Sequence, residues 1–94
     1  MSTTSFDAAA YLSTPEAQKA FLAAALESND TDFIAHALGV VARARGMAEI
    51  AAATGLTKQS LYRSLSKGGN PTLKTVTKVL GALDVKLAVA DNRV

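Results

Sequence analysis

Cysteine and tryptophan are absent from this chain of 94 residues, and histidine occurs only once. Without cysteine the chain can form neither a disulfide nor a thiolate metal site, and it has no cysteine nucleophile; the composition fits a reducing compartment such as the cytoplasm. The single histidine, His36, excludes sites that need two histidines, and we expect it on a solvated helix flank. We therefore expect no cofactor, no metal site and no enzymatic activity.

Long apolar runs are also missing. The longest run, residues 20–26, has seven residues, whereas a membrane helix needs about 20. The first seven residues hold neither a basic residue nor an apolar segment, so we expect no secretory signal and no membrane partner. The pair Gly68–Gly69 lacks the strand and the Lys-Ser/Thr context of a nucleotide-binding loop.

Small apolar residues dominate what is present. Apolar residues make up 49% of the chain and aromatic residues only 5%, while alanine alone occurs nineteen times. This composition is typical of small, closely packed helices. The length predicts one domain, residues 1–94, and so short a chain buries only about two-thirds of its unfolded surface, so that dimerisation would help its stability.

Helix signals divide the chain. Thr14-Pro15-Glu16 is a helix start, and Asp30 can cap a second helix that Gly46 ends. We expect Ala17, Phe21, Leu22, Ala24 and Leu26 on the apolar side of the first helix. In the second helix we expect Phe33, Ala37, Val40, Val41 and Ala44 to face inward, with Gly39 marking close packing. A cluster of Phe6, Tyr11 and Leu12 lies in the lead-in to the first helix.

Two short helices, Met47 to Thr54 and Thr57 to about Ser66, precede a strong loop signal at residues 67–71. Thr72 can cap a last helix whose inward stripe is Leu73, Val76, Leu80 and Leu83. From Val85 to Ala90 the large apolar residues Val85, Leu87 and Val89 alternate with Lys86, Ala88 and Ala90, which predicts a short C-terminal strand. Because no second strand is evident, that strand would pair with a symmetric partner chain. A C-terminal tail that packs on its own domain is a nearly equal interpretation of the same residues.

Charge is unevenly distributed. Residues 1–42 carry one basic residue against five acidic ones, whereas residues 43–78 carry seven basic residues against Glu49 alone. The basic segment has the right sign for phosphates. On charge alone, ordinary solvated faces explain the distribution equally well. The acidic side chains at Glu16, Glu27, Asp30 and Asp32 also fit helix ends and caps.

The segment from Met47 to Leu65 reads as a helix-turn-helix. Ala51 permits a close helix crossing, Gly55 suits a backbone with positive φ, and Thr57 can cap the second helix. Ile50, Leu56, Leu61 and Leu65 provide the apolar anchors. The rest of the second helix is polar, which suits a recognition helix in the major groove of DNA.

Side chains of this segment have the chemistry of a DNA contact. Gln59 can make a bidentate contact to adenine, and Lys58 or Arg63 can make one to guanine, while Ser60 and Lys67 can hold phosphate oxygens. Peptide N–H groups at residues 68–70, the start of the last helix, Arg43 and Arg45 can add backbone contacts. The candidate DNA-binding residues are Thr57, Lys58, Gln59, Ser60, Tyr62, Arg63, Lys67 and Asn70. A helix-turn-helix kept only for protein interaction is the alternative.

The chain resembles the HigA-like addiction-module antidote proteins (antitoxins) of bacteria, which have a lambda-repressor-like helix-turn-helix and are encoded beside a RelE-superfamily toxin. The resemblance includes residues 6–12, 17–26, 42–47, 55–63, 69–72 and 78–83, and Gly-Asn-Pro after Leu-Tyr-Arg is its most specific part. Departures are Ala52-Ala53 and Lys58-Gln59, where relatives often carry charged residues. The Lys58-Gln59 departure would alter which operator is read.

The sequence patterns and this resemblance together predict an all-α, lambda-repressor-like helix-turn-helix domain of about five helices with a short C-terminal strand. Its parts are residues 1–30 (lead-in and helix), 31–83 (helix-turn-helix core) and 84–94 (strand or tail). It implies a bacterial cytoplasmic protein, nucleoid-associated when bound to DNA, that binds operator DNA as a homodimer, represses its own operon and neutralises a RelE/HigB-like toxin.

Such toxins are typically ribosome-dependent mRNA endonucleases and usually basic, so the acidic front half is the expected toxin-binding surface. Its candidate residues are Asp7, Glu16, Glu27, Asp30 and Asp32. An orphan helix-turn-helix regulator without a toxin is the main rival.

Overall fold

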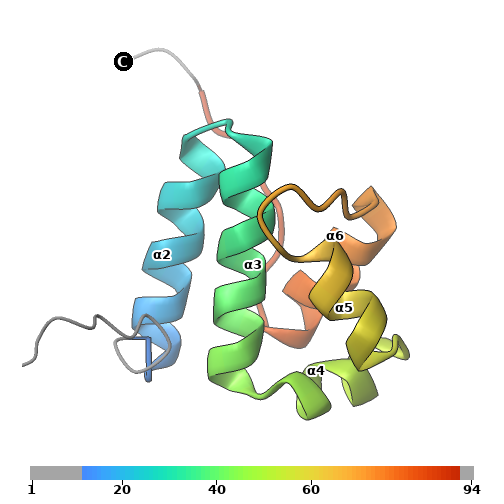
Figure 1. Ribbon diagram of the computed structural model, residues 1–94. Coiled ribbons are helices and arrows are strands. Elements are labelled where there is room, and N and C mark those ends of the chain that lie inside the picture. Colours follow the sequence, from blue (N-terminus) through green and yellow to red (C-terminus); the bar gives the residue numbers. More distant parts are fainter. Residues whose placement is uncertain (1–11, 92–94) are drawn as a thin grey trace, which may run out of the picture.

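The computed structural model describes residues 12–91, and within them five α-helices account for the regular structure (Figure 1). This confirms the expected all-α helix-turn-helix domain. Phe6, Asp7 and Tyr11 lie outside the described residues. The helices are α2 (Pro15–Glu27), α3 (Thr31–Arg45), α4 (Met47–Thr54), α5 (Lys58–Ser64) and α6 (Leu73–Ala82).

Polar residues placed just before four of the helices explain where those helices begin. In each case a side-chain oxygen accepts hydrogen bonds from backbone N–H groups of the first turn, at 3.0–3.2 Å. These N–H groups have no partner inside the helix, so the caps stabilise the helix starts. The capping residues are Thr14, Asp30, Thr57 and Thr72, as the sequence predicts.

Helix α3 is the centre of the arrangement. It packs against α2 on one side and contacts α4 and α5 on the other, and α4 in turn contacts α5 and α6 (Figure 1). Leucine, isoleucine and valine side chains from the lead-in and from all five helices fill the space between these elements. The largest fully buried ones are Leu12, Leu38, Val41, Ile50, Leu61, Leu65 and Val79.

A buried polar network that no sequence pattern predicts crosses the core. The side chain of Gln18 is 5% exposed; its Nε2 donates to the Leu12 carbonyl at 3.0 Å, and its Oε1 accepts from Arg45 Nη2 at 3.2 Å. Arg45 Nη1 also donates to the Ala82 carbonyl at 3.5 Å. Because buried polar groups need partners, this network ties α2, α3 and the end of α6 together.

Three expectations about the helices are wrong in detail. Leu73 is 71% exposed, because it lies in the first turn of α6, while Val79 takes the fully buried place. Ala24 is exposed, and Ala25 is buried instead. Helix α5 ends at Ser64, two residues before the expected Ser66.

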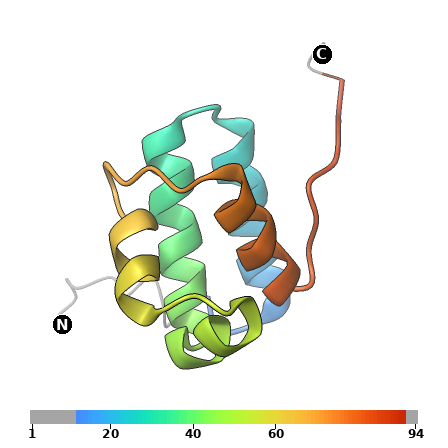
Figure 2. The same ribbon diagram turned by 90° about the vertical axis from the view of Figure 1, so that its right-hand side faces the viewer.

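The expected C-terminal strand is wrong for the single chain. No strand occurs among residues 12–91, and residues 85–91 run as an extended segment along the outside of the helices (Figure 2). An extended segment becomes a strand only when its backbone pairs with another one, and the described part of this chain offers no second extended segment. Val85 alone in this segment packs against the core.

Candidate functional site

The turn between α4 and α5 has the geometry that a helix-turn-helix needs. Gly55 ends α4 with φ +76°, a left-handed conformation that glycine adopts without steric cost. Thr54 is buried; its hydroxyl donates to the Ile50 carbonyl at 2.8 Å and accepts from the Leu56 N–H at 3.3 Å. These bonds fix the turn that sets the direction of α5.

Helix α5 has one buried and one exposed face. Leu61 is fully buried and Leu65, just after the helix, is 1% exposed, so both anchor α5 to the core. The half-buried Ser64 donates its hydroxyl to the Ser60 carbonyl at 3.0 Å, but the other five polar side chains of the helix are exposed, and none of them makes a hydrogen bond or an ion pair with residues 12–91. These side chains, which are therefore available to a partner, are Lys58, Gln59, Ser60, Tyr62 and Arg63.

Two glycines hold α5 and the loop after it in place by close backbone approach. A Cβ atom at Gly39 of α3 would collide with the carbonyl oxygen of Leu65, at the end of α5. A Cβ atom at Gly69 would collide with the carbonyl oxygen of Ser64 and lie 2.8 Å from that of Arg63. The first contact confirms the close packing expected at Gly39, and the second folds the loop back onto α5.

All eight candidate DNA-binding residues are exposed, and they lie within residues 57–70. Six of them belong to α5 and its cap, and Lys67 and Asn70 lie exposed on the loop that follows. The loop's N–H groups are less available than expected, because the Gly69 N–H donates to the Ser66 carbonyl at 2.7 Å. Pro71 has no N–H at all.

The two arginines expected to flank a DNA backbone have different environments. Arg43 is exposed on α3, where it can reach a partner. Arg45 is half-buried and bound to Gln18 and the Ala82 carbonyl. Arg45 is therefore less available to a DNA backbone than Arg43, because its guanidinium already binds within the buried network.

The acidic residues expected to bind a toxin do not form a single cluster. Glu27, Asp30 and Asp32 gather around the turn between α2 and α3, and we call these three the acidic end. Glu16 lies in the first turn of α2, about 16 Å from Glu27 along the helix. Asp7 lies outside the described residues.

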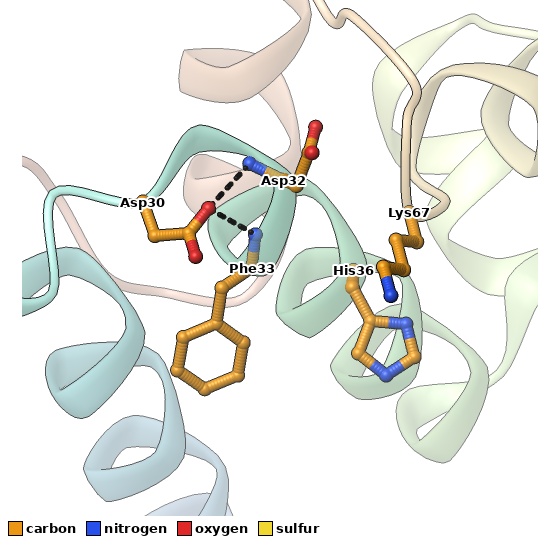
Figure 3. A pocket seen from close by; sticks show the side chains of 5 residues that line it. All are labelled: Asp30, Asp32, Phe33, His36 and Lys67. Atoms are coloured by element: carbon orange, nitrogen blue, oxygen red, sulfur yellow. Dashed lines mark hydrogen bonds between the residues drawn. The ribbon is translucent and has the colours of Figure 1, made fainter.

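An open hollow of about 440 Å³ joins the acidic end to the loop after α5 (Figure 3). Asp30, Asp32, Phe33 and His36 line it from the first turns of α3 and the residue before them, and Lys67 lines it from the loop. Asp30 is also the cap of α3, since its Oδ1 accepts from the N–H groups of Asp32 and Phe33 at 3.1 and 3.2 Å. The hollow therefore brings acidic and basic side chains close together at one end of the molecule. His36 is exposed, as expected.

Neither a metal-binding cluster nor a membrane-spanning helix is found among the described residues. No group of three or more His, Cys, Asp or Glu side chains among residues 12–91 could hold a metal ion. None of the helices in the described part of the chain is both long and apolar enough to cross a membrane.

Comparison with known proteins places the chain among relatives. A family model described as "probable addiction module antidote protein" matches residues 2–91. An uncharacterized protein of Haemophilus influenzae (strain ATCC 51907 / DSM 11121 / KW20 / Rd) is 40% identical over 88 residues, which cover 94% of this chain and 91% of that protein. No solved structure matches the chain significantly.

Proposed function

The chain belongs to the family of addiction module antidote proteins, and on this premise we propose that it neutralises a RelE-superfamily toxin and represses its own operon as a DNA-binding homodimer. Membership of the family supports an antitoxin role and implies a cognate toxin as partner. The DNA and the dimer are finer parts of the proposal that the geometry of the chain supports, whereas the class of toxin rests on the resemblance of the sequence to HigA-like antitoxins.

One observation carries the proposal of DNA binding. Helix α5 is anchored by fully buried leucines, yet five of its six polar side chains have no partner within residues 12–91. These five exposed side chains can all form hydrogen bonds, and Lys58 and Arg63 give the surface a net positive charge. Such a surface fits base edges and phosphates in the major groove. Nothing in the packing of α5 requires these polar side chains.

The residues of this surface take different roles in the proposal. Gln59 and Arg63 read base edges, with Lys58 as a second candidate for guanine. Lys67, Asn70 and Ser60 contact phosphate oxygens, which sets the position of the protein without reading sequence.

Titration of the chain with the DNA directly upstream of its gene tests DNA binding. The assay is a gel shift at two salt concentrations, with a shuffled fragment of equal length as the control. We expect preference for the upstream fragment and a fall of log K with log salt of about 0.9 per phosphate contact. Equal or absent binding to the two fragments would favour a protein-interaction module instead.

The acidic end is the proposed toxin-binding surface, because it carries Glu27, Asp30 and Asp32 together and the toxins of the proposed class are usually basic. Glu27→Lys, Asp32→Lys and Asp30→Asn remove its negative charge, and asparagine at position 30 preserves the helix cap. The matched control is Glu16→Lys at the other end of α2.

Binding of these variants to the protein of a neighbouring small basic reading frame, measured by calorimetry, tests the surface. We expect the triple variant to bind more weakly than the Glu16→Lys control. Unchanged affinity of the triple variant would remove the acidic end from the proposal. If no neighbouring frame encodes a binding protein, an orphan transcriptional regulator becomes the better reading.

A further inference from the structure

The segment after α6 exposes apolar side chains and an unpaired backbone. The N–H of Val85 donates to the Leu80 carbonyl at 3.0 Å, but residues 86–90 make no hydrogen bond within the described part of the chain. Leu87 is 44% exposed and Val89 is fully exposed. An extended backbone with free N–H and C=O groups and alternating apolar side chains is a template for pairing with another strand.

We propose that residues 86–90 pair with the same residues of a second copy of this chain, as an antiparallel two-stranded ribbon around a twofold axis at Ala88. This inference rests on the homodimer of the proposed function and names its surface. A second copy fits because the segment is complementary to itself. Its apolar residues lie on one face, and the residues between them are mostly alanines, which allow close approach.

The register follows from the pairing of side chains within residues 86–90, because the Val85 N–H is already bonded to the Leu80 carbonyl and Val85 stays outside the ribbon. With Ala88 opposite itself, Leu87 lies opposite Val89 of the second copy, so the two large apolar side chains pair with each other, and Lys86 lies opposite the small Ala90. A ribbon centred on Leu87 would bring the two Lys86 side chains into diagonal contact. A ribbon centred on Val89 would place Leu87 opposite Asp91.

An apolar groove beside the segment gives the ribbon a surface to cover, which isolated two-stranded ribbons lack in water. The groove has a volume of about 260 Å³ and lies between α2, α6 and the start of the segment. Val85 lines it, and Leu87 and Val89 continue the same face of the extended chain. The residues lining the groove are Lys19, Leu22, Ala23, Leu26, Leu80, Val85 and Lys86.

Pairing at this place leaves the DNA-binding surface free. Helix α5 and the C-terminal segment lie on opposite sides of the helices in Figure 2. A twofold dimer joined through the segment therefore presents two uncovered α5 helices. Two such helices are what a helix-turn-helix dimer needs to read successive major grooves.

Because the chain has no native cysteine, single-cysteine variants test the register directly. In the proposed ribbon the two Ala88 Cα atoms are about 5.5 Å apart, within the range that a disulfide spans. We expect Ala88→Cys to convert from the 9.7 kDa monomer band to a covalent dimer under mild oxidation, and to revert on reduction. The matched control is Ala53→Cys, an exposed alanine on α4, which should remain mainly monomeric.

A mixture of Leu87→Cys and Val89→Cys chains gives a second test of the register. We expect the mixed pair to cross-link more than either variant alone. Equal cross-linking of Ala88→Cys and Ala53→Cys would overturn the proposal.

Self-association of chains without cysteine distinguishes a failure of the proposed ribbon from a failure of the proposed function. In sedimentation equilibrium we expect Val89→Asp to dissociate at concentrations where the native chain and Leu73→Asp, another exposed apolar position, stay dimeric. Val89 is fully exposed, so the variant should fold, and its melting by circular dichroism checks this. A native dimer that Val89→Asp leaves intact overturns the proposed surface but not the dimer. A native chain that is monomeric while it binds operator DNA overturns both.

Discussion

Replacing Gly39 by alanine should destabilise the protein, whereas the same replacement at Gly81 should stabilise it. Both glycines lie inside helices, α3 and α6, where alanine is the better helix former by up to about 1 kcal/mol. The difference is space. A Cβ atom at Gly39 would collide with the carbonyl oxygen of Leu65 and lie 3.1 Å from its carbonyl carbon, whereas a Cβ atom at Gly81 meets nothing within 4 Å.

The size of each effect follows from these contacts. Overpacking of a core costs about 1–3 kcal/mol, and the upper end applies at Gly39 because the obstacle is backbone and cannot rotate away. After subtraction of the helix-propensity gain, Gly39→Ala should lose about 2 kcal/mol of unfolding free energy, which lowers Tm by about 8–16 °C in a domain of this size. Gly81→Ala should gain about 0.5–1 kcal/mol and raise Tm by a few degrees.

Thermal and urea unfolding followed by circular dichroism measures both changes. Because Leu65 anchors the end of α5, Gly39→Ala should also weaken operator binding at a temperature where the variant is still folded, while Gly81→Ala should not. A Gly39→Ala protein as stable as Gly81→Ala would show that α3 and α5 can separate without cost, and the argument that Gly39 positions α5 would fail.

Three further predictions concern single side chains. Gly55→Ala should cost about 1 kcal/mol of unfolding free energy through its left-handed backbone alone, because the site has open space; urea unfolding measures this cost. Arg45→Ala should lower the unfolding free energy by about 1–3 kcal/mol, because it leaves buried partners unpaired, and it should have little effect on DNA affinity at low temperature. In the same two assays, Arg43→Ala should weaken DNA affinity and leave the unfolding free energy nearly unchanged. Arg63→Ala should cost roughly 1–3 kcal/mol on the operator and less on shuffled DNA, whereas Lys67→Ala should weaken binding to both fragments alike and reduce the salt slope by about one; equal losses for the two variants on both fragments would contradict these roles.

The sequence predicted those parts of the fold that depend on neighbouring residues. A cap such as Thr57 needs only an N–H three residues away, and Gly55 needs only its own φ angle, so both could be read from a few letters. The exposed polar face of α5 could be read in the same way, because Leu61 and Leu65 fix which side is buried.

Features that depend on distant contacts could not be predicted in this way. Arg45 was read as a DNA contact because of its charge, but Gln18, 27 residues earlier in the chain, binds it. Leu73 falls on the apolar stripe of its helix, yet a periodic pattern does not say how far along the helix the core extends. The C-terminal segment has the alternation of a strand, but whether it becomes one depends on a partner that its own sequence does not supply.

Helix α3 connects the two proposed surfaces, and this has a consequence for how they can be separated. Its first turn carries Asp32 of the acidic end, while Gly39, two turns later, holds the end of α5 in place. Changes that shift α3 as a whole must therefore disturb both surfaces. Substitutions of exposed side chains at either end change charge without moving the helix, so they are the ones that can distinguish toxin binding from DNA binding. A substitution of Lys67 changes the charge at both proposed surfaces, because Lys67 lines the hollow with Asp30 and Asp32 and also belongs to the proposed DNA-binding loop.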